Sequence, residues 1–114
     1  MEKQVFKSGA QRDTNENKPR PDLIPGCCSM RVGEHFRLGA EKYGEHNYQK
    51  GIPSSRSLAS LCRHLEKLKM GCTEEDHLAA IVVNAYFIMF NEWKHAGDSE
   101  LLDLPHQGVL NEEA

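Results

Sequence analysis

Two acidic residues, Glu34 and Glu41, stand seven positions apart in a stretch with helical periodicity. Seven residues are nearly two turns of an α-helix, so both carboxylates would lie on the same face. Such a pair fits a magnesium site, because Mg²⁺ prefers oxygen ligands and often uses one or two carboxylates together with substrate phosphates. The alternative is a solvated acidic stripe on the helix surface.

Basic residues recur four positions apart in the segment RHLEKLK. Arg63 and Lys67 would share a helix face and could hold a chain of phosphates, with arginine as the bidentate donor. His64 lies beside them and could shuttle a proton near neutral pH. The alternative is that Arg63 and Lys67 lie on a wet surface beside Glu66.

Asp76, His77 and Asn84 form a third candidate group, and His77 and Asn84 are again seven positions apart. Asn84 lies within the apolar run AAIVVNAYFI, where an amide without partners costs about 1–3 kcal/mol. Its amide would therefore either bridge two helices or bind a ligand such as a base or sugar. The adjacent His and Asp also bring to mind metal phosphohydrolases built on helices, with His64 available as a further histidine.

The segment GAEKYGEHNYQKG, residues 39–51, combines turn-forming, basic and aromatic residues. Glycine permits tight backbone turns, and Tyr43 and Tyr48 could stack on a flat ring or cover the edge of the core. Lys42 and Lys50 supply positive charge, and Asn47 offers both a donor and an acceptor, as a purine edge requires. The segment is therefore a candidate nucleotide-binding loop.

Three helices are expected to position these residues. The apolar spacing predicts helices from about Cys28 to Lys42, from Ser54 or Ser55 to Gly71, and from Thr73 to Gly97, with either serine as the cap of the second. The third is apolar on most sides and should be the most buried. We divide the chain into an irregular N-terminal arm (1–26), a helical domain (27–97) and an acidic tail (98–114), with no strand. The tail is expected to be loosely attached, except that Leu101, Leu102 and Leu104 could form a short docked turn.

The expected fold class is all-α, with a three-helix core that a second copy of the chain completes. Three helices hardly cover a central helix that is apolar nearly all round, so we expect a homo-oligomer, a dimer or tetramer. The net charge is −3, which argues against a nucleic-acid partner. The chain shows neither a membrane span nor a signal peptide, so we expect a cytoplasmic protein. Its four cysteines are expected to be free thiols, because they lack zinc-module spacing.

The order GAEKYGEHNYQKG, SRSLASLCRHL and EEDHLAAIVVNA resembles the phage and bacterial dATP/dGTP diphosphohydrolase-like family. That family typically shows Gly-Ala-x-Lys-Tyr-Gly, Asn-Trp-x-Lys-Gly, Arg-His-Leu and His-Leu-Ala, and an N-terminal segment like RDTNENKPRPDLIP. The resemblance covers roughly residues 9 to 95. The family looks like a branch of the all-α MazG-like nucleotide pyrophosphohydrolases, to which phage MazZ proteins belong.

The resemblance implies site residues in four segments. They are Lys18, Arg20 and Asp22 in the arm, Lys42, Tyr43, Asn47, Lys50 and Gly51 in the loop, Arg63 and His64 on the second helix, and Asp76, His77 and Asn84 on the third. The chain departs from the family at Tyr48, where tryptophan is usual, and at Asn17, where glycine is common. In place of the MazG-like Glu-Glu-x-x-Glu and Glu-x-x-Asp helices it has only approximate counterparts, which are Glu34, Glu41, Glu75 and Asp76.

The implied activity is Mg²⁺-dependent hydrolysis of a purine deoxynucleoside triphosphate, dATP or dGTP, to monophosphate and pyrophosphate, with Mn²⁺ as a second candidate cofactor. Glu34 and Asp76, helped by Glu41 or Glu75, would hold the ion, which would polarise the α-phosphate. Asp76 and one of the two histidines would serve catalysis, and the substrate-binding residues would be Lys42, Tyr43, Asn47, Tyr48, Lys50, Arg63, Lys67 and Asn84. The alternatives are a non-catalytic nucleotide-binding or interaction protein and an HD-like phosphohydrolase.

Overall fold

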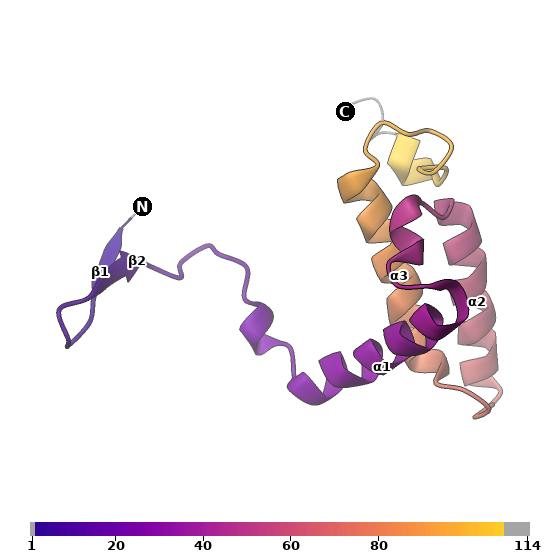
Figure 1. Cartoon of the computed structure of the whole chain (residues 1–114), viewed down its shortest axis with the longest axis horizontal. Helices are drawn as coiled ribbons and strands as arrows, with labels where there is room; N and C mark the ends of the chain where they lie inside the picture. Colours follow the sequence, from indigo (N-terminus) through magenta and orange to yellow (C-terminus); the bar gives the residue numbers. More distant parts are fainter. Residues whose placement is uncertain (1, 109–114) are drawn as a thin grey trace.

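The protein is described by a computed structural model that covers residues 2–108 and is mostly helical. The elements are β1 (Lys3–Val5), β2 (Gln11–Asp13), η1 (Pro21–Leu23), α1 (Gly26–Tyr43), η2 (Asn47–Lys50), α2 (Ser54–Lys69) and α3 (His77–Lys94). The predicted all-α fold with three long helices is confirmed (Figure 1). Within residues 2–108, no helix is both long and apolar enough to cross a bilayer.

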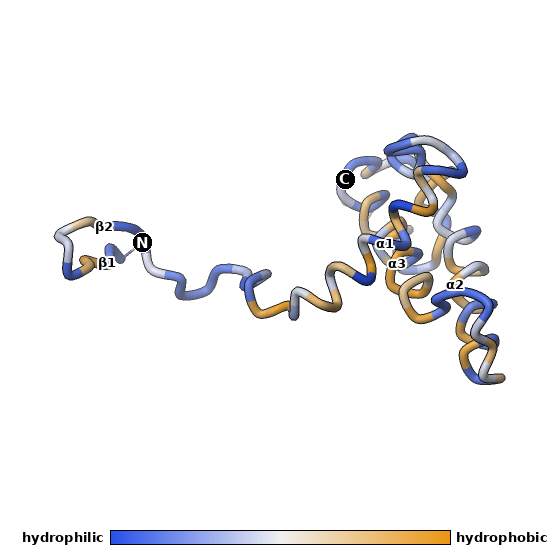
Figure 2. The backbone as a smooth tube through the Cα atoms, turned by 60° about the horizontal axis from the view of Figure 1, so that its bottom comes forward, coloured by the Kyte–Doolittle hydropathy of each residue, from blue (hydrophilic) through white to orange (hydrophobic). Residues whose placement is uncertain are grey.

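The N-terminal arm contains a small sheet that the sequence analysis did not predict. β1 pairs antiparallel with β2, and Gly9 at φ +90° lies in the turn between them. Strands of three exposed residues are too short to show a period, which is why the expectation of no strand was wrong. The mostly hydrophilic chain between β2 and η1 leads away from the helices (Figure 2). The radius of gyration is accordingly 18.3 Å, against about 13 Å for a compact domain of this length.

The three helices are arranged around α3. α2 packs along α3, whereas α1 crosses α3 and has little contact with α2 (Figure 1). An aromatic cluster of Phe36, Tyr48, Phe87 and Phe90 attaches α1 and η2 to α3, with ring centroids 5.0–6.1 Å apart. Because α1 and α2 diverge while both contact α3, the space between them stays open.

The cap of one helix and the start of another differ from the prediction. α2 begins at Ser54 as predicted, but neither serine side chain caps it; the carboxylate of Asp103 accepts from Ser55 N at 2.8 Å and from Ser55 Oγ at 2.5 Å. α3 begins at His77 instead of Thr73, and Asp76 is its cap, accepting from Ala79 N at 3.1 Å. The first helix ends at Tyr43, within one residue of the predicted Lys42, and Gly44 follows it at φ +93°.

The C-terminal segment up to residue 108 is docked on the helices, as expected for the turn at Leu101, Leu102 and Leu104 but not for the residues that follow it; residues 109–114 lie outside the described range. Leu101 O accepts from Ser54 N at 2.9 Å, and the buried Gln107 donates to Glu92 at 2.9 Å. A Cβ on Gly51, which has φ +107°, would lie 2.5 Å from Leu101 Cδ1. Glycine is therefore required where the segment crosses the end of η2.

α3 turns its polar residues inward and an apolar stripe outward. His77, Asn84 and Asn91 recur every seven positions and are all buried. On the opposite face lies an exposed stripe, the outer stripe, formed by Val82, Tyr86, Met89 and Trp93. The buried apolar residues of the described chain are few and mostly small: Ala79, Ala80, Val83 and Leu102.

Candidate functional site

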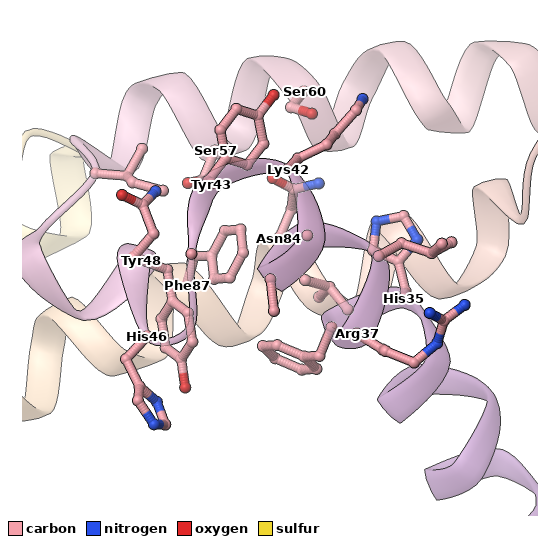
Figure 3. Close-up of a pocket in the computed structure, with 18 of the residues that line it drawn as sticks. His35, Arg37, Lys42, Tyr43, His46, Tyr48, Ser57, Ser60, Asn84 and Phe87 are labelled. Atoms are coloured by element: carbon pink, nitrogen blue, oxygen red, sulfur yellow. The ribbon is translucent and has the colours of Figure 1, made fainter.

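An open cleft of about 1390 Å³ lies between α1, η2, α2 and α3. Figure 3 shows Lys42 and Tyr43 at the end of α1 beside Asn84 of α3. The segment 39–51 is therefore helical in its first part, and only residues 44–51 form the connection. The predicted site residues that line the cleft are Glu41, Lys42, Tyr43, Asn47, Tyr48, Gly51, Arg63, His64, Glu75 and Asn84, whereas Glu34, Lys50, Lys67, Asp76 and His77 do not.

Three basic residues without an acidic partner line the cleft. Lys42 comes from α1, and Arg56 and Arg63 lie seven positions apart on α2. Among the described residues none of the three forms an ion pair. Arg56 was missed by the sequence analysis, although its spacing from Arg63 gave a usable signal. Uncompensated cations around one opening favour an anionic ligand.

Polar groups with spare hydrogen-bonding capacity lie deeper in the cleft. Asn84 is 8% exposed and donates to Ala80 O of its own helix at 2.9 Å. It does not bridge two helices, so the structural explanation for this buried amide is not supported. Ser57, on the first turn of α2, is buried and its Oγ has no hydrogen-bond partner. A buried polar group without a hydrogen-bond partner destabilises the fold unless a ligand or a water molecule forms that hydrogen bond.

The two tyrosines of the loop differ in availability. Tyr48 stacks on Phe87 with centroids 5.0 Å apart and planes at 22°, so one of its ring faces is already covered. This geometry matches the core-edge alternative better than base stacking. Tyr43 also lines the cleft and is 67% exposed, so its ring is available for a planar ligand.

Three of the four carboxylates assigned to Mg²⁺ are paired with arginines. Glu34 and Glu41 do share a face of α1, but Arg37 lies between them and pairs with both. Arg31 donates to the two oxygens of Asp76 at 2.6 and 2.8 Å. These hydrogen bonds lower the pKa of Asp76 to about 2. Neither arginine was considered in the sequence analysis.

The carboxylates expected at the Mg²⁺ site form no three-ligand cluster in the described chain. Within residues 2–108, Glu34, Glu41 and Asp76 belong to no group of three His, Cys, Asp or Glu residues whose ligand atoms lie within 4.8 Å of one another. One group of three does gather: His64, Glu75 and His77. Their composition is rich in nitrogen, whereas Mg²⁺ prefers oxygen.

The histidine pair lies where α2 and α3 meet. His64 Nδ1 and His77 Nδ1 are 2.9 Å apart, and His77 is 2% exposed. Burial lowers the pKa of His64, despite the neighbouring Glu75 carboxylate that acts to raise it. His64 is therefore held neutral near pH 7, and its lone pair can accept a proton or bind a metal.

The remaining predicted residues lie outside the cleft. Arg20 pairs with Asp22 at 2.8 Å within the arm, which leads away from the helices. Lys67 pairs with Glu74 at 3.2 Å. Lys18 and Lys50 are exposed and form no ion pair with other described residues.

One family model matches the chain. It is described as dATP/dGTP diphosphohydrolase, N-terminal, and it covers residues 8–100, which include the arm from residue 8 onward, all three long helices and the start of the docked C-terminal segment. No curated protein and no solved structure matches the chain.

Proposed function

The chain belongs to the dATP/dGTP diphosphohydrolase N-terminal family, and we propose that it hydrolyses a purine deoxynucleoside triphosphate to monophosphate and pyrophosphate in the cleft between α1 and α2. The observation that carries the proposal is the set of three unpaired cations around one opening, Lys42, Arg56 and Arg63. A triphosphate supplies the matching charge, and arginine is the side chain best suited to hold phosphate oxygens in a bidentate geometry.

The nucleoside is placed beside the phosphates by the groups at the end of α1 and in the loop. Tyr43 offers an exposed ring for stacking on the base. Asn47 and Asn84 both line the cleft and can each donate and accept, as a purine edge requires. Ser57 on α2 also lines the cleft, and its Oγ, which has no partner among the described residues, can donate to a phosphate or sugar oxygen.

Cleavage requires that charge be stabilised on the phosphate oxygens and that a water be activated. Arg63 and Lys42 are assigned to the phosphate oxygens, because fixed cations at a partly closed site stabilise developing negative charge. His64 and Glu75 line the cleft with Arg63, so water activation is assigned to this side of it. No step is assigned to Mg²⁺ at Glu34, Glu41 or Asp76, because these carboxylates are occupied by arginines.

The active form is proposed to be a homo-oligomer of two or four chains. The outer stripe of α3 exposes large apolar side chains, including Trp93 at 75% and Met89 at 53%. α1 has no buried residue at all. A second copy that covers the outer stripe would remove this apolar surface from water, at about 25 cal/mol per Å².

Product analysis tests the proposed reaction. The purified full chain is incubated with each dNTP and Mg²⁺, Mn²⁺ or Co²⁺, and the products are identified. Monophosphate with pyrophosphate, from dATP or dGTP in preference to pyrimidine nucleotides, is the expected result. An Arg63→Ala variant prepared in parallel must lose the activity, which excludes a contaminating enzyme.

Two other outcomes of the product analysis would each indicate a different function. Binding of dNTP without turnover would identify a nucleotide-binding protein, an alternative favoured by the arginine-paired carboxylates. Release of inorganic triphosphate with the nucleoside would identify an HD-like phosphohydrolase, which the histidine pair favours.

A further inference from the structure

His64, Glu75 and His77 bring three potential metal ligands to one point from different parts of the chain. His64 lies on α2, Glu75 in the connection, and His77 is the first residue of α3. The distance from His64 Nδ1 to His77 Nδ1 is 2.9 Å, and from His64 Nδ1 to Glu75 Oε1 it is 3.9 Å. The 3.9 Å separation is too long for a hydrogen bond.

These separations match the spacing of ligands around one ion. With metal–nitrogen bonds of about 2.0–2.1 Å, two nitrogens at a right angle are about 2.9 Å apart, and ligands at wider angles are correspondingly further apart. In the ion-free arrangement the two imidazoles share one N–H···N contact, and Glu75 makes no hydrogen bond with either of them. An ion between the three side chains would engage all of them.

The surroundings of His77 Nε2, the ring nitrogen that faces away from His64, also favour a bound metal ion. His77 Nε2 lies 2.9 Å from Glu74 Oε1, but the ring N–H is not aligned with that oxygen, so this buried nitrogen has no hydrogen-bond partner. Glu74 is half exposed and is also held by Lys67 at 3.2 Å. Metal-binding histidines almost always donate their second N–H to a carboxylate or a carbonyl. A small rotation of Glu74 would supply that bond and fix the Nδ1 lone pair toward the ion.

The ligand set selects the class of ion. Two imidazoles and one carboxylate suit zinc and the other first-row divalent ions, whereas Mg²⁺ takes oxygen ligands. Three protein ligands leave at least one position open, as in catalytic sites. His64 and Glu75 line the cleft near Arg63, so that position would face the cleft.

We propose that His64 Nδ1, His77 Nδ1 and the Glu75 carboxylate form a binding site for a divalent transition-metal ion, with Glu74 as the positioning residue of His77. The site deepens the proposed function, since its open position would take a phosphate oxygen or the attacking water. Binding of the ion itself does not depend on nucleotide hydrolysis.

Binding is measured on the full chain without nucleotide. The exposed thiols Cys27, Cys28 and Cys62 are replaced by serine, because thiolates also bind these ions. After removal of metals with a chelator, the protein is titrated with Co²⁺ by visible absorption and with Zn²⁺ by calorimetry. The expected result is one ion per chain and ligand-field bands without thiolate charge transfer.

Variants then assign the ligands. His64→Gln, His77→Gln and Glu75→Gln should each weaken binding at least about 100-fold, and Glu74→Gln should weaken it about 10- to 100-fold. His46→Gln and Glu45→Gln are matched controls elsewhere in the cleft and should bind as the parent does. Circular dichroism monitors folding, and the half-exposed Glu75 keeps the test valid if the buried His77 variant unfolds.

The absence of stoichiometric binding would overturn the proposal, as would parental affinity in a folded Glu75→Gln or His64→Gln variant. In that case the two histidines form only a hydrogen-bonded contact between α2 and α3. Metal binding by a chain that hydrolyses no dNTP would uphold this site and reject the proposed reaction, so the two failures are distinguishable.

Discussion

Asn84 and Asn91 are the same residue type in the same apolar helix, seven positions apart, yet the structure gives them different roles. Asn84 donates only to Ala80 O of its own helix and lines the cleft. Asn91 donates to Ile52 O at 2.7 Å and to Ser54 Oγ at 3.2 Å, which connects α3 to the start of α2. We therefore predict that Asn84→Ala and Asn91→Ala separate ligand binding from stability.

The magnitudes follow from what each truncation leaves behind. Asn84→Ala removes one local hydrogen bond of about 1 kcal/mol and gains up to about 0.7 kcal/mol of helix propensity, so the free energy of unfolding should change by less than about 1 kcal/mol. Asn91→Ala leaves a partly buried carbonyl and a buried hydroxyl without their donor, at about 1–3 kcal/mol each. After the same gain in propensity, a loss of about 1–5 kcal/mol is expected.

Urea denaturation measures the stability of both variants, and calorimetry measures dATP and dGTP binding under conditions without turnover. Asn84→Ala should lose about 3- to 10-fold in affinity, equivalent to one hydrogen bond, while its unfolding midpoint stays near that of the parent. If Asn84→Ala instead destabilised the chain as much as Asn91→Ala and left nucleotide affinity unchanged, Asn84 would be a structural residue and our account of the cleft would be wrong.

Three further predictions test other parts of the structure. Lys42→Ala should weaken dNTP binding about 10- to 100-fold by calorimetry, whereas Lys50→Ala, outside the cleft lining, should have little effect. Asp103→Ala should lower the free energy of unfolding by about 1–2 kcal/mol at pH 7. Burial raises the pKa of Asp103, but the hydrogen bonds from Ser55 outweigh this effect, and the net pKa is lowered. The difference in unfolding free energy between variant and parent should therefore be fully present above about pH 3.9 and should vanish as the pH falls through the folded pKa. Trp93→Glu should reduce the molar mass measured by light scattering, and Met70→Glu, which replaces a similarly exposed residue outside the outer stripe, should not; an unchanged mass in Trp93→Glu would argue against an interface at this stripe.

The helices could be predicted from sequence because their signals are local. Gly44 stops α1 through its positive φ, and the leucine spacing marks α2. The capping of α2 could not be predicted, since Asp103 reaches Ser55 from 48 positions away. A serine at a helix start is a reasonable candidate for its cap. In α2, however, Ser55 N donates to the distant Asp103 carboxylate, and Ser54 N donates to Leu101 O.

The arginine partners of the expected metal ligands do not follow from helical spacing, because spacing places carboxylates on one face of a helix without saying what else lies there. Arg37 stands three positions after Glu34 and four before Glu41, so it pairs with both. Its position was visible in the sequence and could have been weighed. The pairing of Arg31 with Asp76 joins residues 45 positions apart and needed the fold.

In a helix that is apolar on nearly every side, such as α3, the buried polar residues indicate which face packs against the rest of the chain. Apolar residues occur on every side of α3, so periodicity alone could not tell the side facing this chain from the side left open. Buried polar groups are more selective, because each must find a partner or bear an energetic penalty. His77, Asn84 and Asn91 share one face, and two of them meet groups of α2 or its N-terminal connection there. Asn84 on this face lines the cleft, and the opposite stripe, which is apolar apart from the Tyr86 hydroxyl, is the surface that we propose a second copy covers.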